Sequence, residues 1–198
     1  MAITRAILAA SLLAATIAPS FANWQAEISG FDRDRLARID EARTSGLAQS
    51  DGASAADRSA INGVLGPLSS PISAQDLTGT WRCRLMKLGG LAPAIVYGWQ
   101  TCRFRETANG LFFEKTSGTQ RFSGYADPDG AGSFILLAAM TVKDERQRVY
   151  SGAGNSAGAA ATPNDQVGVV SSIGPSHARI EFPFPVLEST FDVIELTR

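Results

Sequence analysis

The stretch GTWRCRLMK, residues 79–87, alternates between apolar and charged side chains. In an extended strand, successive side chains point to opposite faces, so every second residue shares a face. The apolar face carries Trp81, Cys83 and Leu85. Arg82 and Arg84 occupy the other face. This alternation is typical of an antiparallel strand that buries one face and exposes the other.

The same period of two recurs in seven further segments towards the end of the chain. They are IVYGWQTCRFRE (95–106), GLFFEKTS (110–117), TQRFSGYAD (119–127), GSFILLAAMTV (132–142), DQVGVVSSI (165–173), ARIEFPF (178–184) and TFDVIELT (190–197). Turn signals separate several of them, such as Asn109-Gly110 and Ser117-Gly118. Eight short strands in this order predict a mostly up-and-down antiparallel β-barrel, because closure removes the unpaired sheet edges.

Aromatic residues on the inward phase of these strands should line the barrel interior, and most of them should be plain core. They are Trp81, Phe104, Phe113, Phe122, Phe134 and Phe182. Small barrels are usually filled by such side chains, although a subset near one end could line a ligand cavity.

The two cysteines of the chain, Cys83 and Cys102, both take the inward phase if the first two strands form a hairpin. An even pair in an oxidising compartment is most simply a disulfide. A metal or redox pair is the alternative, but the chain has a single histidine and no C-x-x-C spacing. We therefore expect a disulfide between the first two strands, and no metal and no cofactor.

Arginines gather on the opposite, outer phase of the same two strands. They are Arg82, Arg84, Arg103 and Arg105. One interpretation is a solvated outer face, with Glu106, Glu114 or Glu181 as neighbours. The other is a basic surface that, together with Trp99, binds a ligand or a partner. The sequence leaves both open.

The segment before the strands, residues 23–75, is rich in Ala, Asp, Arg and Ser and shows helical spacing. Ser29 and Ser54 are each followed three residues later by an aspartate, a pattern that predicts a helix start. Gly46 should end the first helix. We expect an antiparallel helix pair in which Leu36, Ile39, Ile61, Val64 and Leu65 are buried. The fold class is then α+β, with the helical pair packed on the barrel of residues 76–198.

Residues 1–22, MAITRAILAASLLAATIAPSFA, have the pattern of a secretory signal peptide. Arg5 precedes an apolar run that is too short to cross a bilayer. Cleavage near Ala22 would give a periplasmic or secreted chain that begins at Asn23. Its 17 basic and 19 acidic residues would give a charge of −2, without blocks of like charge. We therefore expect no nucleic acid partner and no membrane span.

The stretch Leu77-Thr78-Gly79-Thr80-Trp81 resembles the Gly-x-Trp opening of lipocalin-like (calycin) barrels. This resemblance implies that Trp81 closes the bottom of the barrel. The periplasmic metalloprotease inhibitors open similarly and carry a disulfide, but here a helical segment replaces their N-terminal trunk. As a whole, the chain most resembles an uncharacterised proteobacterial secreted family, a domain of unknown function. The shared pattern is the signal peptide, the helical segment and the GTWRCR and YGWQTCRF strands, and it implies no activity.

Residues 154–158, GNSAG, match the G-x-S-x-G motif of hydrolases, with Ser156 as the nucleophile and Asp165 and His177 in the expected order. The motif lies in a low-complexity segment rich in Gly and Ala, so we interpret it as accidental and expect no catalytic residues. The function that the sequence favours is a small exported binding or inhibitor module, whose partner is a small apolar ligand or an envelope protein. The alternatives are a serine hydrolase that uses Ser156, and a structural envelope protein.

Overall fold

The structure, a computed structural model, describes residues 23–152 and 162–198. The expected signal peptide and Ser156 lie outside the described residues.

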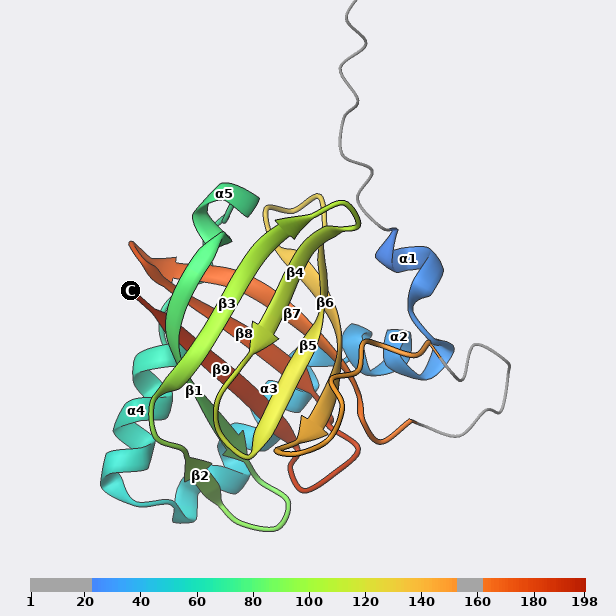
Figure 1. Ribbon diagram of the computed structural model, residues 1–198. Coiled ribbons are helices and arrows are strands. Elements are labelled where there is room, and N and C mark those ends of the chain that lie inside the picture. Colours follow the sequence, from blue (N-terminus) through green and yellow to red (C-terminus); the bar gives the residue numbers. More distant parts are fainter. Residues whose placement is uncertain (1–22, 153–161) are drawn as a thin grey trace, which may run out of the picture.

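Nine antiparallel strands form one sheet. They are β1 (Gly79–Leu88), β2 (Ala94–Val96), β3 (Gln100–Thr107), β4 (Gly110–Lys115), β5 (Gln120–Pro128), β6 (Phe134–Val142), β7 (Asp165–Gly174), β8 (His177–Pro183) and β9 (Phe191–Thr197). β2 and β3 both pair with β1, each strand from β3 to β8 pairs with the next, and β1 also pairs with β9. This last pairing closes an eight-stranded barrel (Figure 1). The prediction of an α+β protein with an antiparallel barrel is confirmed.

The predicted second strand, 95–106, is interrupted. β2 pairs with the far end of β1, where Met86 lies opposite Val96, and β3 pairs with the near end, where Trp81 lies opposite Cys102. Residues 97–99, with Gly98 at their centre, lie between β2 and β3 and belong to neither strand. Tyr97 and Trp99 are therefore set apart from the regular alternation of the sheet.

A single cluster of buried side chains occupies the barrel interior. It includes all six aromatic residues expected there from the sequence, each 4% exposed or less. The outer phase of β1 and β9 is also apolar at one end, where Met86, Leu88, Phe191 and Val193 form a second cluster with Ala42, Ile61 and Val64. The barrel therefore has a core inside and another core between its wall and the helices.

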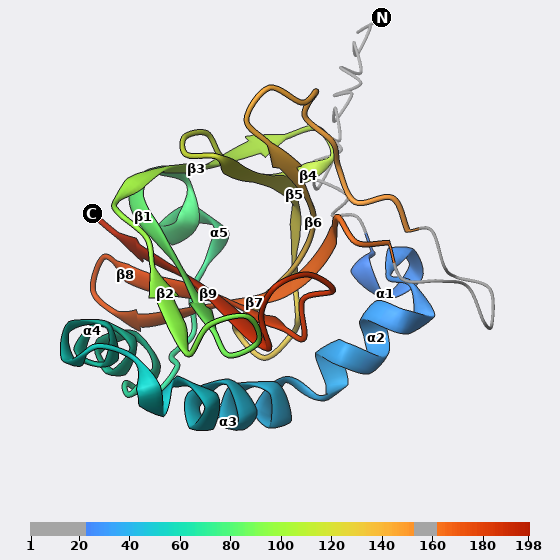
Figure 2. The same cartoon turned by 90° about the horizontal axis from the view of Figure 1, so that it is seen from below.

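Most of the helical segment lies along the outside of the barrel, and its last helix lies at one end of it (Figures 1 and 2). It consists of α1 (Trp24–Glu27), α2 (Gly30–Ala37), α3 (Ile39–Gln49), the 3-10 helix η1 (Ser50–Gly52), α4 (Ala55–Leu65) and α5 (Ala74–Leu77). Ser29 and Ser54 cap α2 and α4, and each accepts a hydrogen bond from the backbone N–H three residues later, as predicted. Ile61 and Val64 are buried, and Leu36, Ile39 and Leu65 are half-buried against the barrel clusters.

Two details of the predicted helices are wrong. The first helix is split at Arg38, and Gly46 does not end it, because α3 continues to Gln49. A Cβ atom on Gly46 would lie 2.7 Å from the Cβ of Phe191, so the glycine allows the helix to approach β9 closely. The helices accordingly follow one another as a band on the barrel.

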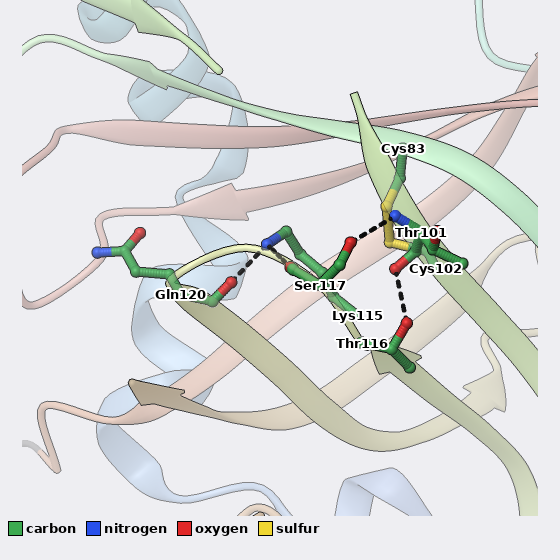
Figure 3. The surroundings of a disulfide bond; sticks show 7 residues. All are labelled: Cys83, Thr101, Cys102, Lys115, Thr116, Ser117 and Gln120. Carbon is green, nitrogen blue, oxygen red and sulfur yellow. Dashed lines mark hydrogen bonds between the residues drawn. A yellow bond between two sulfur atoms is a disulfide. The ribbon is translucent and has the colours of Figure 1, made fainter. Parts of the chain in front are cut away.

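The predicted disulfide is present. Cys83 of β1 and Cys102 of β3 are bonded, with their Cα atoms 5.8 Å apart, and both side chains are fully buried in the barrel interior (Figure 3). Cys102 lies opposite Trp81 and Cys83 opposite Gln100, so the bond joins diagonal neighbours on the inner face. It fixes the first two strands of the closed barrel to each other.

Replacing both cysteines, Cys83→Ala with Cys102→Ala, should lower the free energy of unfolding by about 2–4 kcal/mol without changing the fold, because the unfolded chain regains the freedom of the closed loop. Urea unfolding of both proteins measures the loss. The intact mass of the non-reduced native protein provides the control. Two alkylatable thiols in that protein would contradict the pairing.

Candidate functional site

The helices cover only one side of the barrel. They pack mainly against β7, β8, β9, β1 and β2, and Ile28 and Leu36 also contact the apolar cluster on the outer face of β6. In both ribbon views, β3 and β4 lie on the opposite side and present their outer face without a helix over it (Figures 1 and 2). Residues on the outer phase of β3 and of the adjoining half of β1 are therefore available to a partner.

Trp99 lies between two arginines at this bare sector. The guanidinium carbons of Arg82 and Arg84 are 4.8 Å and 4.5 Å from the centroid of the Trp99 ring. Each arginine therefore forms a cation–π contact with this ring. The Trp99 side chain remains 40% exposed. A large ring in this setting is oriented by its neighbours and still accessible from solvent.

Arg84 is held by a buried carboxylate. Its Nε lies 2.5 Å from Oε2 of Glu195, whose Oε1 is 2.9 Å from Nε2 of His177. Glu195 is only 6% exposed, so Arg84 is anchored on one side while its guanidinium meets Trp99 on the other. The ion pair orients the arginine before any partner arrives.

Arg103 and Arg105 extend the same outer face along β3, and both are exposed. Arg105 lies 4.4 Å from the ring centroid of Phe112, and its Nε is 3.9 Å from Glu114. We call the surface formed by Arg82, Arg84, Arg103, Arg105 and Trp99 the arginine face. Its four arginines meet two carboxylates, Glu114 and Glu195, so it is positive in a chain whose net charge is −1.

One expected neighbour of these arginines lies elsewhere. Glu181 is on the outer phase of β8, where it contacts Arg179 at 2.9 Å and Arg43 of α3 at 2.7 Å. Glu181 is 2% exposed because the helices cover this part of the wall. It therefore balances buried charge under the helices and not the arginine face.

Asp165 and His177 do not meet. Asp165 begins β7 and His177 begins β8, so the ten residues of β7 separate them along the barrel. Asp165 accepts hydrogen bonds from the Ser151 hydroxyl at 2.6 Å and the Ser151 N–H at 3.1 Å, whereas His177 bonds to Glu195. These two residues cannot act as the acid and base of one triad, whatever the position of Ser156.

A second buried polar cluster joins α2 to the start of β7. Arg35 lies 2.8 Å from Asp32 and donates to the backbone oxygen of Asp165 at 2.7 Å, and the Tyr150 hydroxyl donates to Asp32. Burial and the bond to Asp32 raise the pKa of Tyr150 to about 12. The charged and polar groups of this cluster pair with one another, so the cluster holds the helical segment on the barrel.

Comparison with protein families matches residues 24–196 to DUF4893, described as a domain of unknown function. The chain belongs to the DUF4893 family. The matched region covers both the helical segment and the barrel, which thus form one family unit. No curated protein and no solved structure matches the chain.

The DUF4893 barrel is closed at the end where β1 begins. Trp81 donates from Nε1 to the backbone oxygen of Leu77 at 2.7 Å, and the guanidinium carbon of Arg198 lies 3.9 Å from its ring centroid. Arg198 also donates to the backbone oxygens of Asp76, Leu77 and Thr78, which ties α5 across this end. A cleft of about 680 Å³ lies beside it, between α5 and the β7–β8 turn.

The opposite end, which we call the mouth, carries polar residues on the inward phase of the strands. They are Lys87, Gln100, Lys115, Gln120 and Asp192. The sequence analysis missed them, although the signal was present: each continues an inward, apolar alternation towards one end of the barrel. Lys87 follows Leu85 by two residues, and Lys115 follows Phe113 by two.

Within the described residues of the DUF4893 chain, no helix is long and apolar enough to cross a membrane. The same part of the chain holds no group of three or more His, Cys, Asp or Glu side chains that could bind a metal ion.

Proposed function

We propose that this DUF4893 protein is an exported binding module of the inhibitor type, which docks an acidic protein surface onto its arginine face. The observation that carries the proposal is Trp99, an exposed ring flanked by Arg82 and Arg84 on the sector of the barrel that the helices leave open. Tryptophan and arginine are the residue types most enriched among those that dominate binding energy at protein interfaces.

Charge supports an acidic partner. The arginine face carries four arginines against two glutamates, and Glu195 is buried beneath Arg84. Positive and negative surfaces attract each other during encounter and suppress wrong partners. The packed barrel interior further favours a macromolecular partner over a small apolar ligand enclosed in the barrel.

Two features support export. Residues 1–22 have the pattern of a signal peptide, and the buried Cys83–Cys102 disulfide suits an oxidising compartment. The lipocalin-like character of the barrel rests on the Gly79 and Trp81 pattern, and Trp81 lies at the closed end.

Photo-crosslinking in the cells that make the protein tests the docking surface. A benzophenone amino acid is placed at Thr101, an exposed β3 residue opposite Arg82, and separately at exposed Ala48 of α3 as a control. We expect an adduct from position 101 that weakens at high salt and is lost with Trp99→Ala or Arg82→Glu, because both changes remove the proposed contact.

Adducts of equal yield at positions 101 and 48, or an adduct that survives both substitutions, would argue against the arginine face. Circular dichroism of each variant confirms that it is folded. N-terminal sequencing of the protein recovered from the periplasm or medium tests export separately, with Asn23 as the expected first residue.

A further inference from the structure

The mouth of the barrel has a buried cation without a carboxylate partner. Lys115 is 3% exposed, and its Nζ donates to the backbone oxygens of Ser117, at 2.8 Å, and Gln120 (Figure 3). Among the described residues, it forms no ion pair. A buried charge is costly unless it is paired, so a lysine without a carboxylate partner on the inner face of the barrel calls for an explanation.

The ammonium group has donor capacity left. An ammonium carries three N–H donors, and two of them are used by Ser117 and Gln120. Lys115 also lines a cavity of about 220 Å³ together with Leu85, Tyr97, Gln100, Gln120 and Glu188. The third donor has no partner among the described residues.

Two residues that line this cavity carry unused acceptors. The side-chain oxygens of Gln100 and Gln120 are buried and have no hydrogen-bond partner among the described residues. An unpaired buried acceptor costs free energy that a ligand donor would recover. One cationic donor and two neutral acceptors therefore belong to residues that line this cavity.

A carboxylate of the protein already lies at the rim. Glu188, in the loop between β8 and β9, accepts from Lys87 at 2.5 Å and from the Gln120 amide at 3.2 Å. Its side chain is 45% exposed, and it lines both the first cavity and a second one of about 260 Å³, which also contains Lys87. Lys87 is thereby neutralised and Lys115 is not.

We propose that the mouth binds a small carboxylic acid whose neighbouring atoms donate hydrogen bonds, with the carboxylate at Lys115 and the donors at the side-chain oxygens of Gln100 and Gln120, which turn towards the cavity when the ligand binds. Hydroxy acids and N-acyl amino acids both have this chemistry. The inference goes beyond the docking function, because the arginine face lies on the outer surface and the mouth residues point inward.

The protonation of Lys115 supports the proposal. Burial, together with the nearby charge of Arg121, lowers the pKa of Lys115 to about 8. A bound carboxylate favours the charged amine, so binding should take up protons near pH 8 and weaken as the pH rises above that value. Glu188 and Lys87 line the second cavity at the mouth, and Asp192 lies opposite Lys87 in the pairing of β1 with β9. Burial raises the pKa of Asp192 to about 6.

Nitrogen-15 labelling of the lysines gives a direct readout, because the chain contains three lysines, Lys87, Lys115 and Lys143. The oxidised protein is titrated with glycolate, N-acetylglycine and acetate, and with the neutral amides of the first two. We expect the first two acids to shift the Lys115 Nζ signal and bind more tightly than acetate, which lacks the donors. Whichever of glycolate and N-acetylglycine binds more tightly shows whether the ligand is a hydroxy acid or an N-acyl amino acid. The amides should leave the signal unmoved.

Variants separate the roles of the residues. Lys115→Met should weaken glycolate binding about 10- to 100-fold, since one charged hydrogen bond is lost. The control Lys143→Met changes an exposed lysine that does not line either cavity and should have no effect. Glu188→Gln should tighten binding several-fold, because it removes a like charge from the cavity wall and frees Lys87.

Equal binding of acids and amides, an unmoved Lys115 signal, or unchanged affinity in Glu188→Gln would overturn the proposal. The last variant tests it without altering Lys115, which matters if Lys115→Met does not fold. Trp99→Ala should retain glycolate binding, so failure of the docking function and failure of this site are distinguishable.

Discussion

Arg179→Leu should lower the free energy of unfolding by about 3–5 kcal/mol. Arg179 is 4% exposed, and its Nε contacts Glu181 at 2.9 Å. Its remaining nitrogens donate to the backbone oxygens of Val64 and Pro67, at 2.8 Å and 3.1 Å, and to the Ser69 hydroxyl at 2.8 Å. The substitution leaves a buried carboxylate and several acceptors without this donor at the end of α4.

Urea unfolding followed by circular dichroism measures the loss, and Arg38→Leu is the matched control. Arg38 also pairs with a carboxylate, Glu41, at 2.8 Å, but both side chains are about half exposed. Exposed pairs of this kind contribute about 0–1 kcal/mol, so the control should be nearly as stable as the parent protein. Equal losses in both variants would show that the contact of α4 with β8 does not depend on the buried pair.

Trp81→Ala should also cost about 3–5 kcal/mol, because it leaves a large cavity at the closed end of the barrel. The indole is 3% exposed, donates to Leu77 and lies under the Arg198 guanidinium. The substitution therefore removes core packing, one buried hydrogen bond and the cation–π contact with Arg198.

Trp99→Ala is the control for this prediction, because it removes the same residue type from the outside of the same barrel. Trp99 is 40% exposed and loses mainly its two cation–π contacts, which suggests a cost of about 1 kcal/mol. Thermal unfolding of both variants checks the difference. A Trp99→Ala protein as unstable as Trp81→Ala would mean that Trp99 has a structural role instead of a binding role.

Alternation in the sequence predicted the barrel and the disulfide because both depend on which side of a strand a residue faces. Trp81, Cys83 and Cys102 share the inner face, as a period of two requires. The same rule placed Arg82 and Arg84 outside. It held because every inward position near the middle of a closed barrel must be apolar and packed.

The sequence pattern did not predict features that depend on the helices outside the barrel, because alternation within a strand does not show what packs against its outer face. Arg179 and Glu181 have the pattern of a solvated face, yet α3 and α4 bury them. Gly46 has the pattern of a helix end, but a glycine is needed there because α3 approaches Phe191 closely. Lys87 and Lys115 also lie on the inward phase of their strands. A rule that assigns inward positions to the apolar core therefore does not predict the polar mouth.

The closure of the barrel by β1 and β9 has a consequence for how the chain folds. Arg84 pairs with Glu195 across more than a hundred residues, and Phe191 and Val193 on the same strand form the floor for α3. The pairing of β1 with β9 and the packing of α3 on β9 can form only after the last strand has been synthesised. Folding must then proceed with high contact order, a regime of milliseconds to seconds. Before β9 pairs with β1, α3 and the unpaired edge of the sheet expose apolar surface that has no native partner. Such surface makes a folding intermediate prone to aggregation.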